Sequence, residues 1–336
     1  LSTVLGGRLV KLDMSREETF ASNRVRHAIR YHIISHVRAD GTFVAGKLEA
    51  YSNQGAYASH GHGVCAKGAG AFRQLYRYRS ACKGDAYTVY TNIAAAGAMR
   101  GYGIPQMMFA MESHVDDIAR RLNIPPLTLR QMNLMEVGYR DSFSKNENYF
   151  DSFNQCIKKG MEYIDYDRKL EEFSHDTGDI RRGIGMAVFW YNTAVFPISL
   201  ETSSCRLQLN LDGTVNLQVG ETEIGQGADT AYAQMCAEIL GLSDYKKVRV
   251  ISCQDTDITP TGLGAYASRQ TFTAGFSIRQ TSEMLKKKIL DYACELTRQA
   301  AYNMDIIDSN IVRTTDGRVL MSLSELSMTA QYNPVH

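Results

Sequence analysis

The sequence predicts an α+β fold in two subdomains, and three observations favour it. Two Asp-Gly pairs, Asp40-Gly41 and Asp212-Gly213, lie between runs of alternating apolar and polar residues, which is typical of β-hairpins. Segment 106–122 carries apolar residues at spacings of three and four, which is typical of an amphipathic helix. Strands and helices are expected on both sides of a polar connection at 175–182. We therefore expect mixed or antiparallel sheets with helices packed against them.

The length and composition favour a two-domain globular protein. A chain of 336 residues fits about two domains, and we place the boundary in the polar connection, giving subdomains at 1–178 and 179–336. The formal net charge is +1, so no basic field favours nucleic acid or a membrane surface. No apolar run approaches the ~20 residues that a membrane-spanning helix needs. We expect neither a nucleic-acid nor a membrane partner.

The cysteines favour a reducing compartment. The seven cysteines are scattered, and none stands in a CxxC pair. This pattern indicates reduced thiols rather than a disulfide framework or a zinc site. Because no signal peptide is visible either, we expect a cytoplasmic protein. We expect no side chains that ligate a metal.

The first half is expected to contain strands, one long loop and helices. The loop at 53–73 is rich in glycine, alanine, serine and histidine, and such long loops are usually functional or mobile. His60 and His62 lie two residues apart in it, which suits a metal site or, as we favour, a solvated loop. Strands are expected at 24–38, 43–51 and 87–91, and helices at 106–122, 127–135 and 151–173.

Two residue patterns in the first half each have two interpretations. Arg24, Arg26 and Arg30 share one face of a strand, because side chains in a strand alternate between faces. They form either an anion-binding patch or, as we favour, a solvated face. The methionine-rich stripe of the 106–122 helix could likewise bind a ligand, but we favour core packing.

The second half is expected to be richer in strands. Trp190, the single tryptophan, lies in an apolar run that predicts a strand at 183–191. Gly241 is placed as the stop of a helix at 228–240. Further elements are expected as strands at 205–210, 214–219 and 248–253, a long helix from 270 to about 300, and a hairpin turn at Asp316-Gly317.

The stretch 97–106, GAMRGYGIPQ, holds three glycines, Arg100 and Tyr102 directly before a helix. Glycine lets backbone approach a ligand closely, arginine suits phosphate or carboxylate oxygens, and a helix N-terminus attracts anions. We interpret this stretch as an anion-binding loop with Tyr102 as a flat wall beside it. A plain glycine-rich turn between a strand and a helix is the alternative.

The order strand, small-residue loop, helix occurs three times, with loops centred near residues 101, 225 and 267. The second loop reads GETEIGQG at 220–227 and the third reads TGLGAYASRQ at 261–270. Three helix N-termini that point to one place would bind a polyanionic ligand. None of the loops is a GxxxxGK[ST] phosphate loop or a GxGxxG dinucleotide fingerprint, which argues against an ATP or nicotinamide site.

Taken in order, the loops resemble those of the molybdenum-binding subunit of the xanthine dehydrogenase and aldehyde oxidoreductase family of molybdenum hydroxylases, in its central portion. The segment MRGYGIPQ at 99–106 is similar to the family pattern [FM]-R-G-[FY]-G-x-P-Q throughout, and 220–227 is similar to G-x-x-E-[MI]-G-Q-G. The segment ASRQ at 267–270 resembles the third cofactor loop. The resemblance covers essentially the whole chain, implies the cofactor-binding architecture of this family, and is greatest to bacterial purine-hydroxylase-type subunits.

The resemblance implies roles for individual residues. Arg100 would contact the pterin or its phosphate, and Gln226 would hydrogen-bond close to the metal. Tyr102 would stack on a flat heteroaromatic substrate together with Phe196, a contact that contributes about 0.5–1.5 kcal/mol beyond the buried area. No metal ligand is implied. The implied cofactor-binding residues are Arg100, Gly101, Ile224, Gly225, Gln226, Ala267, Ser268 and Gln270.

Two parts of the family machinery are expected outside this sequence. A loop that ends in Gly-Gly-Lys-Glu would precede Leu1, and the catalytic glutamate, a general base, would follow His336. We therefore expect this chain alone to be incomplete and inactive. A substrate-orienting arginine of some purine enzymes falls near Gly68, with Lys67 beside it, which weakens an assignment to xanthine.

The resemblance implies an oxidoreductase with a molybdopterin-type molybdenum cofactor. It would oxidise a C–H bond of an N-heteroaromatic (purine-like) or aldehyde substrate, with water as the oxygen source. Electrons would leave through iron–sulfur clusters and FAD on partner chains or domains, because no cysteine cluster of this sequence could hold an iron–sulfur centre. Expected partners are these subunits and the remaining parts of the molybdenum subunit, and a homodimer is compatible with the same picture.

Two other functions use the same sequence. The chain could be a non-catalytic fragment or scaffold that binds no cofactor on its own, and molybdenum and phosphorus analysis with and without partners separates this from an enzyme. A generic nucleotide-binding α/β protein is the third candidate. The missing phosphate-loop lysine argues against it.

Overall fold

The computed structural model describes residues 1–141, 145, 147–195, 201–251, 255 and 257–332. The chain divides into two compact units, Leu1–Tyr191 and Asn192–His336, each with its own sheet and core. The division into molybdopterin-binding subdomains at 178/179 stays a prediction. Within the described residues, no helix combines the length and apolar character needed to cross a membrane.

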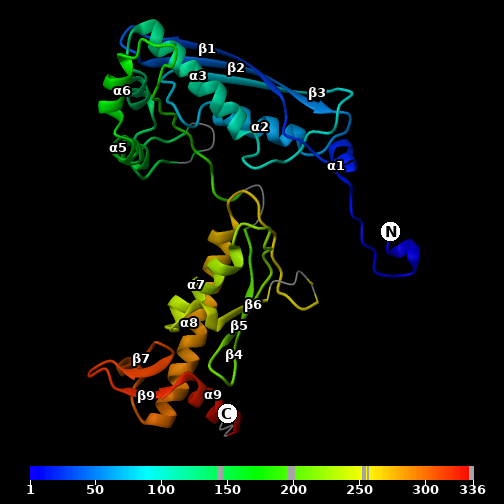
Figure 1. The fold of residues 1–336 in the computed structure, drawn as a ribbon, viewed down its shortest axis with the longest axis vertical. Coiled ribbons are helices and arrows are strands. Elements are labelled where there is room, and N and C mark those ends of the chain that lie inside the picture. Colours follow the sequence, from blue (N-terminus) through cyan, green and yellow to red (C-terminus); the bar gives the residue numbers. More distant parts are fainter. Residues whose placement is uncertain (142–144, 146, 196–200, 252–254, 256, 333–336) are drawn as a thin grey trace. The chain divides into compact units, whose positions relative to one another are not determined.

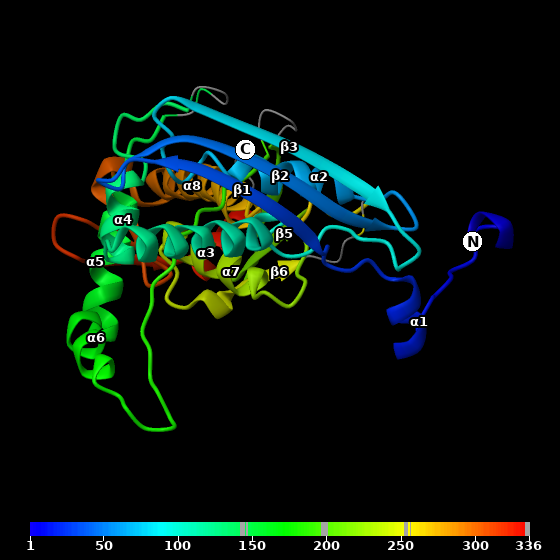
Figure 2. The same ribbon diagram turned by 90° about the horizontal axis from the view of Figure 1, so that it is seen from above.

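The first unit is a three-stranded sheet with helices along one face. The strand order is β1-β2-β3, with β1 antiparallel and β3 parallel to β2. Helices α2 and α3 contact the same sheet, which they cover from one side (Figures 1 and 2). Its elements are a 3-10 helix at Thr3–Leu5, α1 Arg16–Ser22, β1 Ile29–Val37, β2 Phe43–Gly55, α2 Gly61–Ala71, β3 Ala81–Tyr90, α3 Ile104–Leu122, α4 Pro126–Asn133, α5 Ser152–Ile164 and α6 Tyr166–Ser174.

The hairpin and the amphipathic helix predicted in this unit are confirmed. The turn between β1 and β2 contains Asp40, whose Oδ1 accepts a hydrogen bond from the Thr42 N–H over 2.9 Å. The methionine stripe of α3 faces the core, with Met107 and Met111 fully buried. Packing of an apolar helical stripe on the sheet supplies most of the stability of such a helix.

Two expectations for the first unit are wrong. The long loop expected at 53–73 contains α2, whose buried positions include Gly61, Val64 and Gly68. Its small residues give no strong apolar periodicity, and the helix forms because it packs closely on neighbouring backbone. The strand expected at 183–191 does not form, although all its residues are described: the Val188 N–H donates to Glu112 Oε2 over 2.8 Å instead of joining a sheet.

The second unit contains two small sheets and two packed helices. Sheet β4-β5-β6 pairs β4 with β5 antiparallel and β5 with β6 parallel, and β7-β8-β9 is antiparallel. Helices α7 and α8 pack together against the first of these sheets (Figure 1). The elements are β4 Cys205–Leu209, β5 Val215–Val219, α7 Ala228–Leu240, a 3-10 helix at Tyr245–Lys247, β6 Val248–Ile251, α8 Gln270–Thr297, a 3-10 helix at Ala301–Asn303, β7 Met304–Ile307, β8 Asn310–Arg313, β9 Val319–Ser322 and α9 Leu323–Tyr332.

Most elements expected in the second unit are present. The hairpins around Asp212-Gly213 and Asp316-Gly317 form, and α7 ends at Gly241 with a left-handed φ of 72°. The strand expected at 248–253 is described as far as Ile251. With mixed and antiparallel sheets covered by helices, the α+β prediction is confirmed.

The two units share one order of elements, which the sequence did not reveal. After α1 in the first unit and from β4 in the second, each runs through an antiparallel hairpin, crosses through a helix to a parallel third strand, and then enters a second helix. The loop before α3 therefore corresponds to the loop before α8, and the turn before α2 corresponds to the loop before α7. The three predicted loops each join a strand to a helix N-terminus, as expected.

Candidate functional site

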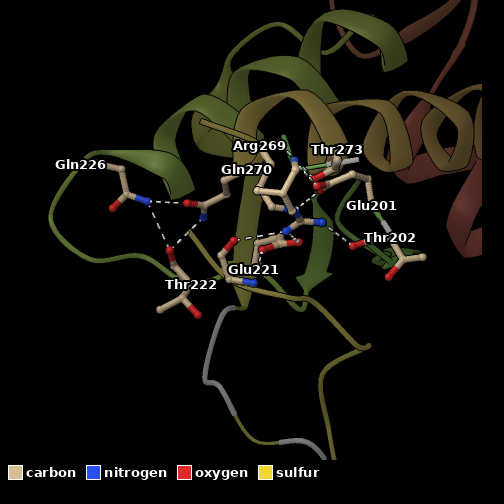
Figure 3. A network of polar contacts seen from close by, with 10 residues as sticks. Glu201, Thr202, Glu221, Thr222, Gln226, Arg269, Gln270 and Thr273 are labelled. Carbon is tan, nitrogen blue, oxygen red and sulfur yellow. Dashed lines mark hydrogen bonds and ion pairs between the residues drawn. The ribbon is translucent and has the colours of Figure 1, made fainter. Parts of the chain in front are cut away.

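Two of the three predicted loops converge within the second unit (Figure 3). Gln226, in the loop before α7, donates its Nε2 hydrogen to Gln270 Oε1 over 2.8 Å, and Gln270 is the first residue of α8. Both side-chain amides also donate to the carbonyl oxygen of Thr222, over 3.2 and 2.8 Å. Gln226 is exposed and Gln270 is buried, so the buried side chain anchors the exposed one.

The backbones of these two loops touch. A Cβ built on Gly220 would lie 2.0 Å from the carbonyl oxygen of Pro260 and 2.5 Å from the Gly262 nitrogen. Such distances exclude any side chain at position 220, so glycine is required for this close approach. An isolated β-bridge between Ser203 and Gly262 fixes the same loop from its other side.

Glu223 organises the loop before α7. Its Oε1 accepts hydrogen bonds from the N–H groups of Gly225 and Gly227, and its Oε2 accepts one from Asp229, over 2.7, 3.1 and 3.1 Å. The Asp229 N–H, with those of Gly227 and Gly225, lowers the pKa of this carboxyl against the opposing effect of desolvation. These N–H groups of the loop and of the first turn of α7 are therefore already paired within the chain, and the anion site stays a prediction.

A buried arginine joins the same two loops. Arg269 is fully buried and lies between the carboxylates of Glu201 and Glu221, at 2.5 and 3.0 Å (Figure 3). Burial alone would lower the pKa of its guanidinium. The hydrogen bonds to the two carboxylates raise this pKa by more than burial lowers it, so the pKa lies above its ordinary value. A buried cation that is paired and hydrogen-bonded in this way stays charged.

The third loop enters α8 through strained backbone. Ala267 and Ser268 both have positive φ, at 50° and 52°. Such values are uncommon for residues other than glycine and mark segments that the surrounding structure holds in place. Ser268 is exposed.

The first predicted loop has three successive residues with positive φ: Gly101 at 99°, Tyr102 at 47° and Gly103 at 91°. A Cβ on Gly103 would lie 2.2 Å from the carbonyl oxygen of Val64, so the turn into α3 needs glycine there. Tyr102 is thereby projected from a tight turn at the helix N-terminus.

Arg100 is an exposed cation on this turn. Among the residues that the structure describes, its guanidinium has no hydrogen-bond or ion-pair partner, so it is available to an anion. Arg26 donates its Nη2 hydrogen to the Arg100 carbonyl oxygen over 2.6 Å, and the stem of Arg24 covers Gly97. All three arginines are exposed, but they do not share one strand: Arg30 lies on β1, whereas Arg24 and Arg26 precede it and contact the loop.

Tyr102 is held by the turn before α2. Its hydroxyl lies 3.1 Å from His60 Nδ1, and the two rings meet edge to face with centroids 6.0 Å apart. Burial raises the pKa of Tyr102. The pKa of Tyr191 is raised as well, mainly by burial and to a smaller extent by the charge of nearby Tyr102. His60 thus supports an aromatic side chain. The described residues contain no group of three His, Cys, Asp or Glu side chains that could hold a metal ion.

Position 68 cannot carry the substrate-orienting arginine of some purine enzymes in this backbone. A Cβ on Gly68 would lie 2.9 Å from the Gly103 carbonyl oxygen. The neighbouring Lys67 is half-buried, and its ammonium lies 5.9 Å from the centroid of the Trp190 ring. Burial lowers the pKa of Lys67.

The residues present fit a flat, anionic cofactor. Gly225 and Gly227 have open space where a side chain would stand, which leaves room for a ligand over the loop. Gln226 is exposed, but both hydrogens of its Nε2 are donated within the chain, to Thr222 and Gln270. The exposed Ser268 offers a polar side chain, and in the first unit the exposed guanidinium of Arg100, which has no partner among the described residues, supplies positive charge. Ile224, on the same loop as Gln226, is exposed and offers an apolar surface.

Three parts of the prediction remain outside this geometry. Phe196 lies outside the described residues. Arg100 and Gly101 belong to the first unit and the other implied residues to the second, so the convergence of all three loops stays a prediction. The direct contacts of every implied residue with a cofactor likewise stay a prediction.

Sequence reasoning missed several residues that shape the site. Glu201 and Glu221 lie 68 and 48 positions before Arg269, so no local spacing pairs them. The signal available was a charged residue inside loops otherwise made of small residues. His60 gave only a weak metal signal because its partner, Tyr102, is 42 positions away.

Comparison with known proteins agrees with the three loops. A family model described as "Molybdopterin cofactor-binding domain" matches residues 159–335, and a second model with the same description matches residues 1–134. Together these matches cover most of the chain, including all three loops.

Individual relatives extend well beyond this chain. The xanthine dehydrogenase molybdenum-binding subunit of Escherichia coli O157:H7 is 41% identical over 335 residues, which is 99% of this chain and 44% of that protein. The aldehyde oxidoreductase of Megalodesulfovibrio gigas is 27% identical over 80% of this chain and 29% of its own length. The chain thus spans less than half the length of the curated relatives it matches.

A solved structure shares the fold. Quinoline 2-oxidoreductase from Pseudomonas putida 86 superposes with a TM-score of 0.83 at 22% identity, covering 99% of this chain and 44% of that one. Two cofactor-binding family matches, a relative at 41% identity and the same fold lead to one assignment. The chain belongs to the molybdenum-binding subunits of the xanthine dehydrogenase family, with two molybdopterin cofactor-binding domains.

Proposed function

We propose that this chain holds a molybdopterin-type molybdenum cofactor and forms the central part of a molybdenum hydroxylase. The enzyme oxidises a C–H bond of an N-heteroaromatic, purine-like compound or of an aldehyde, with water as the oxygen source. The observation that carries the proposal is the contact between Gln226 and Gln270, which brings two cofactor-type loops to one place. The names of the relatives, which mention xanthine, aldehyde and quinoline, support both substrate classes.

The residues of this chain bind and orient the cofactor. Gln226 would exchange its hydrogen bond to Gln270 or Thr222 for one to the cofactor, close to the metal. Ser268 and Ala267 offer backbone and a small side chain to the pterin, and Arg100 offers a planar cation to the phosphate. Ile224, Gly225, Gly101 and Gln270 complete the set of contacts. The bound cofactor supplies the capacity to accept electrons from the substrate C–H bond.

Tyr102 orients the substrate. Its ring is held edge-on by His60, so it can present a flat face to a heteroaromatic ring. Phe196 is the second aromatic that we assign to this sandwich. Because Lys67 is half-buried against Trp190 and position 68 is a glycine, substrate orientation does not depend on an arginine there.

Catalysis needs groups outside this sequence. We assign the general base to a glutamate and part of the cofactor cradle to a Gly-Gly-Lys-Glu loop, both in further polypeptide of the molybdenum subunit. Electrons leave through iron–sulfur clusters and FAD carried by partner chains or domains. A homodimer and a cytoplasmic location are compatible with this proposal, and the chain alone is expected to be inactive.

Metal analysis of the complete protein tests the proposal. The chain should be purified alone and together with the polypeptide that completes it, and molybdenum and phosphorus should be measured per chain. We expect both elements in the complete protein and neither in the chain alone. Absence of both elements from both preparations would favour the alternative, a non-catalytic scaffold.

A further inference from the structure

Arg269 makes more contacts than pairing of its charge requires. Its Nε donates to Glu201, Nη1 donates to Glu221 and to the Gly264 carbonyl oxygen, and Nη2 donates to the Thr202 carbonyl oxygen. The four distances are 2.5, 3.0, 3.2 and 2.6 Å. A planar guanidinium can satisfy such a set of directions at once, whereas the ammonium of lysine cannot.

The two carboxylates extend these contacts to the backbone of separate segments. Glu221 Oε2 accepts a hydrogen bond from the Gly264 N–H over 2.9 Å, and Glu201 Oε1 accepts one from the Val195 N–H over 2.7 Å. The group therefore joins Val195 and Glu201–Thr202 to the loop before α7 and the loop before α8. A buried group of two acids and one arginine is a poor source of stability compared with apolar packing, so its value lies in the geometry that it imposes.

The geometry imposed is the strained entrance to α8. Ala267 and Ser268, directly before Arg269, both have positive φ, and Ala194, also at positive φ, donates its N–H to the Ala267 carbonyl oxygen over 2.7 Å. Conformations of this kind persist only where the surrounding structure holds them. Arg269 directly follows Ser268, and its side chain is held by four hydrogen bonds.

We propose that Arg269 is a positioning residue for the cofactor: through Glu201 and Glu221 it holds Ala267 and Ser268 in the left-handed conformation that faces the ligand. The same contacts place Gln270 where it meets Gln226 (Figure 3). Arg269 itself is fully buried and touches no ligand. This inference rests on the proposed function, because the ligand that these loops face is the molybdenum cofactor.

The test uses the complete protein with Arg269→Lys, which keeps the charge but loses the planar fork. We expect the molybdenum and phosphorus content after dialysis to fall by about tenfold or more, since several hydrogen bonds to a charged group are lost. Arg279→Lys is the matched control: Arg279 lies on the same helix, its side chain is exposed, and it pairs with Glu283 four residues on. The control should keep the wild-type content.

Rescue separates positioning from general stability. Because Ala267→Gly and Ser268→Gly also remove side chains that we assign to the cofactor, their own effect is measured first in the otherwise wild-type chain. Arg269→Lys should then lower the cofactor content much less in the double-glycine background than in the wild-type background, because glycine adopts positive φ without support. A wild-type content in Arg269→Lys, or an equal loss in both backgrounds, would overturn the proposal.

Hydrogen exchange provides a readout that does not depend on cofactor. The Gly264 amide, which donates to Glu221, should exchange faster in Arg269→Lys than in the wild type and in the Arg279→Lys control. If the wild-type protein contains no molybdenum or phosphorus, the proposed function fails, and unchanged exchange at 264–270 would then overturn the positioning role as well. If the wild type and Arg269→Lys contain the same amount of molybdenum and phosphorus, only the positioning role is contradicted.

Discussion

Gln226 and Gln270 are 44 positions apart in the sequence, and the Nε2 group of the first donates to Oε1 of the second over 2.8 Å. The contact joins the loop before α7 to the first residue of α8. Both amides share the Thr222 carbonyl oxygen as a second acceptor, so the pair is fixed to the backbone between them. Two predictions concern the loop that carries Gln226, two concern the loop before α3, and one concerns the core of the first unit.

Gln226→Ala in the complete protein should lower the cofactor content and the activity together. The variant removes an exposed amide and the hydrogen bonds that hold it, worth about 1 kcal/mol each, so retention should weaken by about tenfold. Molybdenum and phosphorus per chain are the measurement. Gln208→Ala, an exposed glutamine on β4, is the control. Full metal content and turnover in Gln226→Ala would show that this residue does not hold the cofactor.

Arg100→Ala should also reduce cofactor content, because it removes an exposed guanidinium that has no protein partner within the described residues. Hydrogen bonds from a cation to an anion are worth about 1.5–3 kcal/mol, so the loss should be at least about tenfold. Arg30→Ala removes an exposed arginine from β1 of the same unit and should leave the content unchanged. Equal contents in both variants would contradict the role of Arg100.

Tyr102→Ala should raise KM for flat heteroaromatic substrates more than for small aldehydes, since only the former stack on the ring. A stacking contribution of about 1 kcal/mol corresponds to about a fivefold change in KM. Tyr102→Phe keeps the ring but removes the hydroxyl that meets His60, so its effect should be smaller. Steady-state kinetics with both substrate classes is the measurement, and equal effects on both classes would exclude stacking.

Glu223 should make the stability of the second unit depend on acid pH. Backbone N–H groups, led by that of Asp229, lower its pKa in the folded chain below the ordinary value of about 4.3. The stabilisation is therefore complete above the unfolded pKa and is lost as pH falls through the folded pKa. The difference in Tm between wild type and Glu223→Gln should be present at neutral pH and should shrink below about pH 4.

The control for this pH dependence is Glu238→Gln, which removes a carboxylate from the exposed side of α7. A Tm difference between wild type and Glu223→Gln that stayed constant from neutral to strongly acid pH would mean that the ionised carboxylate does not stabilise the loop.

Met111→Ala should destabilise the first unit by about 2–5 kcal/mol, because it opens a cavity beneath a fully buried position of α3. Phe109→Ala, at a position of the same helix that is 78% exposed, should change stability by less than about 0.5 kcal/mol. Urea unfolding followed by circular dichroism compares the two. A similar small effect for both would contradict the placement of the methionine stripe in the core.

The sequence predicted those parts of the fold that have a local signature. The hairpins at Asp40-Gly41 and Asp212-Gly213 and the apolar stripe of α3 each depend on residues close in sequence. Helix α2 was missed because glycine and alanine carry no apolar periodicity. The strand expected at 183–191 was wrong because an apolar run does not reveal whether its backbone finds a neighbouring strand.

The site shows the same limit. The three loops were recognisable because their residues are contiguous, and Gln226 and Gln270 each lie in one of them. The group of Glu201, Glu221 and Arg269 is formed by residues far apart, and pairing them needed the fold. The positive φ of Ala267 and Ser268 is likewise invisible in a sequence, since both residue types normally adopt negative φ.

The central claim is that the loops around Arg100, Gln226 and Ser268 face one molybdenum cofactor. The most direct test is an anomalous difference map at the molybdenum edge from crystals of the complete protein. The account predicts a peak whose cofactor density is bordered by all three loops. A peak bordered by other segments, with these loops turned to different sides of the protein, would contradict it.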